Sequence, residues 1–143
     1  MSELELEAEV IQLSIYCETI MTILKQQEAL SVIKTMTFTY LIKKNRFYMK
    51  DVYTGKNTRG LVTKSLSLMN GLKDDYYRSL HLIAQAIDLL IESNKIEISN
   101  EVLIIKDKTY KTTVKENSFF NKSIQASELF TDRQFLKEVL NNV

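Results

Sequence analysis

The chain has 143 residues and a mass of 16.6 kDa, which is near the commonest size for a single domain. Its hydrophobic content of 45%, charged content of 26% and net charge of +1 are ordinary and require neither a nucleic acid nor a membrane as partner. A single Cys and a single His exclude a disulfide framework and a His-based metal cage, and no apolar run approaches the roughly 18 residues of a membrane span. Because the acidic start is also unlike a signal peptide, we expect a cytoplasmic protein that folds as one domain over residues 1–143.

The first predicted element is a helix over residues 2–27. We expect residues 1–27 to form an N-terminal docking helix. Six apolar residues recur at spacings of four and three, which places them on one stripe: Leu6, Val10, Leu13, Cys17, Ile20 and Leu24. This stripe can pack on the protein's own core or lie on a partner protein. Additional isoleucines broaden the apolar face, which favours burial over a two-stranded coiled coil.

The next predicted element is a helix over residues 29–44, the first part of a helical core that spans 28–106. It is apolar on nearly every side, which is typical of a central helix. Thr residues alternate with apolar residues in its second half, so a strand over 35–42 is an alternative. The length of the apolar segment favours the helix.

Two further helices and a hairpin complete the predicted core. Gly and Asn mark a loop up to about residue 58, and a short helix over 60–72 precedes a longer one over 74–93. Two β-branched runs joined by a polar turn then predict a wing hairpin over 95–106. A helix followed at once by a small hairpin is the end of a winged helix-turn-helix, and the two preceding helices would supply the rest of that unit.

Residues 107–143 are predicted to form a connection and a C-terminal helix. Residues 107–122 show no strong period, and Phe119 and Phe120 are expected to fix this irregular connection to the core. The closing helix over 124–143 contains a capping-box pattern at Thr131 and Gln134. Its apolar face consists of Phe135, Leu136, Val139 and Leu140. We predict a mainly α-helical fold with a small β-hairpin, a winged-helix-like domain flanked by N- and C-terminal helices.

The residue types that carry catalysis or metal binding are sparse. His81 lies beside an apolar stripe and is expected to be a half-buried or surface helix residue, whereas Cys17 lies on a stripe and is expected to be a small buried hydrophobe. The adjacent Asp74 and Asp75 are typical of a first helical turn. Three scattered Gly residues form no phosphate-binding loop. We therefore predict no catalytic, cofactor-binding or metal-binding residue, no cofactor and no small-molecule substrate.

The distribution of charge is more informative than its sum. A basic segment with interleaved aromatic residues covers 43–64, and its expected contacts are either a nucleic acid or an acidic partner. The residues assigned to this contact are Arg46, Lys50, Lys56, Arg59 and Lys64. The predicted recognition helix over 74–93 has the wrong sign for a major groove, with four acidic residues against Arg78. A winged helix used for protein–protein contact fits this pattern better.

The order of elements resembles a known family. A basic loop (LIKKNR at 41–46, KNTR at 56–59) leads through two helices to a wing hairpin (LLIESNKIEIS at 89–99, VLII at 102–105), and the chain ends in ASELFTDRQFLKEVL at 126–140. This pattern resembles the small middle component of bacterial three-component ABC-ATPase defence systems of the Lamassu type. The first 27 residues lie outside the resemblance, and the family's Asn-Pro opening is missing because the chain has no Pro.

The resemblance implies an accessory subunit without catalytic residues that bridges an SMC-like ATPase and an effector, often a nuclease. It also implies that the subunit holds the effector inactive until the ATPase engages DNA. In this hypothesis the first and last helices are protein interfaces, through Leu6, Val10, Leu13, Ile20, Leu24, Phe135, Leu136, Val139 and Leu140.

Two other functions remain open at this stage. The first is a winged-helix transcriptional regulator that binds duplex DNA as a homodimer through its first helix. The second is a small immunity or inhibitor protein that binds one partner tightly and needs no DNA.

Overall fold

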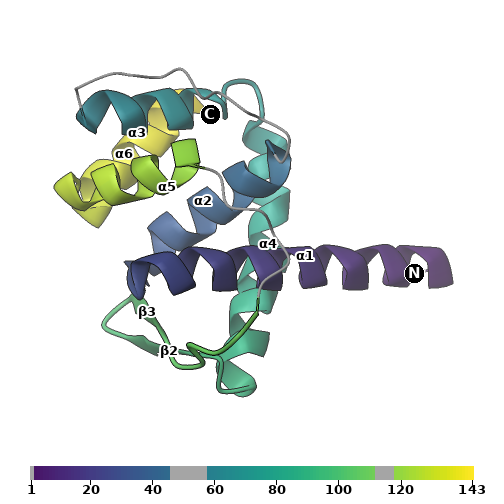
Figure 1. Ribbon diagram of the computed structural model, residues 1–143. Coiled ribbons are helices and arrows are strands. Elements are labelled where there is room, and N and C mark those ends of the chain that lie inside the picture. Colours follow the sequence, from purple (N-terminus) through teal and green to yellow (C-terminus); the bar gives the residue numbers. More distant parts are fainter. Residues whose placement is uncertain (1, 46–57, 112–117) are drawn as a thin grey trace.

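The computed structural model describes residues 2–45, 58–111 and 118–143, which are mostly helical. Figure 1 shows the small sheet at one edge of the helical part of the molecule. The helices are α1 (Glu3–Gln27), α2 (Val32–Lys44), α3 (Thr58–Ser67), α4 (Lys73–Glu92), α5 (Ser118–Ala126) and α6 (Asp132–Asn142), with a 3-10 turn η1 (Ser127–Leu129) between the last two. The strands are β1 (Ala29–Ser31), β2 (Ile96–Ser99) and β3 (Val102–Ile105).

Helix α1 has the predicted extent because local hydrogen bonds define both of its ends. Ser2 caps it: the Ser2 hydroxyl oxygen accepts from the Glu5 N–H at 3.2 Å, and the Glu5 carboxylate accepts from the Ser2 N–H at 3.3 Å. At the other end Glu28 adopts a positive φ of 66° and donates its N–H to the Leu24 carbonyl. This reversal directs the chain from the helix into β1.

The sheet contains a strand that the sequence did not predict. β1 pairs antiparallel with β3, and β3 pairs antiparallel with β2, which gives the order β1-β3-β2. The prediction placed residues 29–31 inside a helix because three residues are too few for an alternating pattern. Ser31 ends the strand and caps α2 by accepting from the Lys34 N–H. The helix reading of α2 is confirmed, and the strand alternative over 35–42 is wrong.

The wing hairpin forms as predicted, between β2 and β3. Asn100 and Glu101 make its two-residue turn, with φ values of 51° and 63°. Such paired positive φ values match the right-handed twist of the two strands.

The winged-helix-like core consists of α1, α2, α4 and the sheet. The helix over 60–72, which was predicted to belong to the same unit as the helix over 74–93, is not part of it. Helices α1, α2 and α4 contact one another, whereas α3 packs mainly against α5 and α6. In Figure 1 these last three helices gather on the side of α2 away from the sheet. Residues 60–72 therefore do not pair with 74–93. The α3 residues Leu61 and Leu66 are apolar and bury against the C-terminal helices instead, where Ser123 donates its hydroxyl to the Leu61 carbonyl.

The C-terminal region has more helix than expected and is divided differently. α5 begins at Ser118 inside the predicted irregular connection, and Phe119 and Phe120 are buried as expected. The predicted helix over 124–143 is interrupted because Phe130 adopts an extended conformation and Thr131 starts α6 with the predicted capping box to Gln134.

Candidate protein-interaction surfaces

The predicted apolar stripe of α1 divides into a buried half and an exposed half. Ile20 and Leu24 have no exposed surface and belong to the core, so in this fold they cannot form a docking face. Leu13 is half-buried, whereas Leu6 and Val10 are 54% and 57% exposed. Spacing alone could not reveal this division, because all of these residues share one stripe.

The exposed half of α1 extends beyond the rest of the molecule. Figure 1 shows its N-terminal turns passing α4 into open space. We call residues 3–11 the projecting segment; every residue in it is exposed except the half-buried Glu9. It also exposes Leu4 and Ile11, which lie outside the predicted stripe and add to its apolar surface. The first fully buried residue of α1 is Tyr16.

Helix α6 divides in the same way. Phe135 and Val139 are fully buried, and the Phe135 ring lies 5.7 Å from that of Phe38 on α2. The prediction that these two residues form an interface therefore does not fit the fold. Leu136 and Leu140 remain 41% and 54% exposed on the outer face of α6 and are accessible to a partner.

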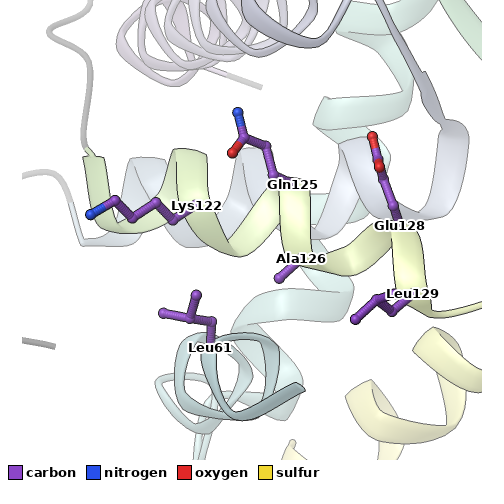
Figure 2. A pocket seen from close by; sticks show the side chains of 6 residues that line it. All are labelled: Leu61, Lys122, Gln125, Ala126, Glu128 and Leu129. Atoms are coloured by element: carbon purple, nitrogen blue, oxygen red, sulfur yellow. The ribbon is translucent and has the colours of Figure 1, made fainter. Parts of the chain in front are cut away.

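An open hollow of about 350 Å³ lies between α3 and the end of α5. Figure 2 shows Leu61, Ala126 and Leu129 directed toward its interior, while Gln125 and Glu128 point away. The hollow is mainly apolar, and Lys122 at one end is the one basic side chain among the described residues that line it. The sequence analysis did not identify it, because its walls come from elements more than 50 residues apart.

The basic residues assigned to a nucleic acid or acidic partner are only partly placed. Arg46, Lys50 and Lys56 lie outside the described residues. Arg59 is exposed on α3, with its guanidinium carbon 4.9 Å from the centre of the Phe130 ring, whereas Lys64 is half-buried. Because these two residues are five positions apart on one helix, they point in different directions and do not form one patch by themselves.

The exposed side chains of α4 carry slightly more acidic than basic charge. Asp74, Asp88 and Glu92 are exposed together with Lys73, Arg78 and His81. Asp75 faces α2 instead: its carboxylate accepts from the Tyr40 hydroxyl at 2.7 Å and lies 3.0 Å from the Lys44 ammonium. These two donors hold the pKa of Asp75 below its ordinary value.

The two side chains considered for catalysis differ in their surroundings. His81 is exposed on α4, whereas the half-buried Cys17 directs its thiol to the Ala86 carbonyl at 3.7 Å. Burial raises the pKa of the Cys17 thiol, with a smaller contribution from Glu18, so its reactive thiolate form is disfavoured. Within residues 2–45, 58–111 and 118–143, no three His, Cys, Asp or Glu side chains lie close enough to hold a metal ion.

Lys34 is a buried charged residue that the sequence analysis missed. Its side chain is only 8% exposed, and its ammonium donates to the carbonyls of Ser127 and Phe130 at 2.8 and 2.7 Å. Burial lowers the pKa of Lys34, while Asp132 and Glu128 act in the opposite direction. Its position within an otherwise apolar helix was the only signal in the sequence.

Among the described helices, none is long and apolar enough to cross a membrane. Comparison of the chain with protein-family models, with curated proteins and with solved structures found no match.

Proposed function

We propose that this chain is a non-catalytic accessory subunit of a cytoplasmic anti-phage defence complex, in which it bridges an SMC-like ABC ATPase and an effector nuclease. The observation that carries the assembly role is the projecting segment. Its side chains Leu4, Leu6, Val10 and Ile11 are all more than half exposed. The type of complex is taken from the resemblance of residues 28–143.

The form of α1 supports docking through this segment. Exposed apolar side chains of this kind, here the Leu6–Val10 pair, commonly mark a protein-binding site, and the burial of their surface is favourable by about 25 cal/mol per Å². The same helix continues without a break into the core, where Ile20 and Leu24 are fully buried. A partner on the projecting segment would therefore set the orientation of the whole domain.

The second predicted docking surface keeps only its outer residues. Leu136 and Leu140 provide exposed apolar area on α6, at a distance along the chain from the projecting segment. A bridging subunit needs two separate surfaces, and these two faces meet that requirement. The exposed charges of α4, three acidic against two basic, provide no basic surface for DNA phosphates, which favours protein contact.

The test is co-expression of the tagged chain with the products of its neighbouring genes, followed by purification and mass spectrometry. We expect recovery of a large coiled-coil ATPase. The double variant Leu6→Asp/Val10→Asp is expected to lose it, because charge is introduced into the contact surface. The control Ile98→Asp/Leu129→Asp changes two side chains of similar exposure, 51% and 55%, outside both proposed docking surfaces and is expected to keep the ATPase. Equal recovery with both double variants would contradict docking through α1.

A second candidate is a winged-helix regulator that binds duplex DNA as a homodimer. The specific observation in its favour is the placement of α4 directly before the β2–β3 hairpin. Such a regulator should bind duplex DNA without other proteins, and its affinity should fall steeply as salt increases. The accessory subunit should show weak binding or none under the same conditions. Recovery of the chain only as a DNA-binding dimer would favour the regulator and contradict the accessory role.

A further inference from the structure

The projecting segment combines apolar and acidic side chains and contains no basic one. Glu3, Glu5, Glu7 and Glu9 alternate with Leu4, Leu6, Ala8 and Val10, and the first basic residue of α1 is Lys25. With about 3.6 residues per turn, Glu3 and Glu7 fall on one side of the Leu6–Val10 pair and Glu9 on the other. The exposed apolar side chains are therefore flanked by carboxylates.

These carboxylates are available to another molecule. Glu5 accepts from the Ser2 N–H within its own helix. In the described part of the chain, the ion pairs Lys44–Asp75 and Lys95–Asp107 lie on other elements and involve no residue of this segment. The negative charge of the segment is thus uncompensated within the described fold.

From this arrangement we infer that the projecting segment binds a basic amphipathic helix of a partner protein, whose apolar stripe is flanked by Lys or Arg. The inference rests on the proposed function, because it specifies the chemistry of the partner that docks there. Apolar side chains would pair at the centre of the contact, and opposite charges would pair at its edges, as at the flanking positions of coiled coils.

A second copy of the chain fits this surface poorly. Pairing two projecting segments through Leu6 and Val10 would bring Glu3, Glu7 and Glu9 of each copy to one contact, and like charges placed together oppose association. The same repulsion would act at an anionic lipid surface. A basic partner removes the repulsion and gains attraction from the same residues.

The experiment uses the full chain and three designed helical peptides of about 20 residues each. The first peptide has a Leu stripe flanked by Lys. The second replaces every Lys with Glu, and the third keeps Lys but replaces every Leu with Ser. Binding is measured by fluorescence anisotropy at about 50 mM salt and again at about 200 mM salt.

We expect the Lys–Leu peptide to bind at least about tenfold more tightly than either comparison peptide, and more weakly at the higher salt concentration. Leu6→Asp/Val10→Asp should reduce its affinity at least about tenfold, whereas the matched control Ile98→Asp/Leu129→Asp should leave it unchanged. Circular dichroism of both variants checks that they are folded.

Several results would overturn the inference. Undetectable binding of the Lys–Leu peptide, equal binding of the Glu–Leu peptide, or equal binding of the Lys–Ser peptide would each contradict it. Self-association of the chain in sedimentation, abolished by Leu6→Asp/Val10→Asp, would show that the occupant is a second copy.

The outcome is separable from that of the proposed function. If the ATPase is recovered through Leu6 and Val10 but the Lys–Leu peptide does not bind, the docking surface stands and its assigned partner chemistry is wrong. If the peptide binds as expected but no ATPase is recovered, the partner chemistry stands and the accessory role fails.

Discussion

The ammonium group of Lys34 donates a hydrogen bond of 2.7 Å to the main-chain carbonyl of Phe130, 96 residues further along the chain. A second hydrogen bond reaches the Ser127 carbonyl at 2.8 Å. The two acceptors lie at the first residue of η1 and directly after its last residue, and the Ser127 carbonyl also accepts from the Phe130 N–H at 3.0 Å. Lys34 thereby attaches the C-terminal helices to the central helix α2.

Replacement of this lysine should be costly although it removes only one side-chain group. Lys34→Met keeps the aliphatic length but removes both hydrogen bonds and leaves the Phe130 carbonyl without this donor, so we expect the free energy of unfolding to fall by about 2 kcal/mol. Urea denaturation measures this change. Lys122→Met, at an exposed position of α5, is the control and should change stability by less than about 0.5 kcal/mol. Equal stability of the two variants would show that the Lys34 hydrogen bonds contribute little.

The turn of the wing provides a second prediction, because Glu101 holds a φ of 63° without being a glycine. Its carbonyl accepts from the Val32 N–H, a bond that any residue at this position retains. Glu101→Gly should therefore raise stability by about 0.5 kcal/mol, as relief of backbone strain exceeds the added flexibility of the unfolded chain. Thermal denaturation of the variant and the parent protein measures the change.

Gly71 allows the reverse substitution, in which a glycine at positive φ is replaced by a residue with a side chain. It has a φ of 80°, and a Cβ added there would meet nothing within 4 Å. Gly71→Ala should nevertheless lower stability by about 1 kcal/mol, because the cost comes from backbone conformation and not from collision. If Gly71→Ala proves neutral, backbone strain at positive φ is not significant in this protein.

The Asp75 carboxylate makes the stability of the protein depend on pH in the acidic range. Hydrogen bonds from Tyr40 and Lys44 hold its pKa below the usual 3.8. The pKa of Asp75 is lower in the folded state than in the unfolded chain. The stabilisation from its ionised carboxylate is therefore complete at pH values above the unfolded-state pKa, and it is lost as the pH falls through the folded-state pKa. Asp75→Asn should cost less than about 1 kcal/mol at neutral pH, since the pair is partly exposed.

Urea denaturation of Asp75→Asn and the parent protein between pH 7 and about pH 2 tests this sign. The difference in stability should shrink at the acidic end, where the parent carboxyl is protonated. Asp74→Asn, one position earlier and exposed, controls for the removal of a first-turn charge from α4. A difference that grows toward acid would contradict the assigned direction of the pKa shift.

Features that depend on neighbouring residues in the sequence were predictable. The capping pattern of Thr131 and Gln134 forms in the fold, and the β-branched runs on either side of Asn100 and Glu101 form the hairpin. Each of these is decided by contacts a few residues apart, which a sequence pattern records directly.

Features that depend on distant residues were not predictable in the same way. β1 exists because Leu30 pairs with Leu103, and the partner of α3 is set by burial against α5 and α6. Lys34 gained its role from carbonyls more than 90 residues away. For the interaction surfaces, sequence spacing placed Leu6 and Leu24 on one stripe. Which of the two is buried depends on how far the rest of the folded domain reaches along α1.

That difference between Leu6 and Leu24 is itself testable. Leu24→Ala empties space in a fully buried site and should lower the free energy of unfolding by about 2–5 kcal/mol. Leu6→Ala removes a side chain that is 54% exposed and should change it by less than about 0.5 kcal/mol. Urea denaturation of the isolated chain compares them. A large loss for Leu6→Ala would mean that the projecting segment is already covered in the isolated chain and is not free to bind a partner. With a small loss, the apolar character of position 6 is unnecessary for folding, and a loss of partner recovery in the same variant would then reflect binding alone.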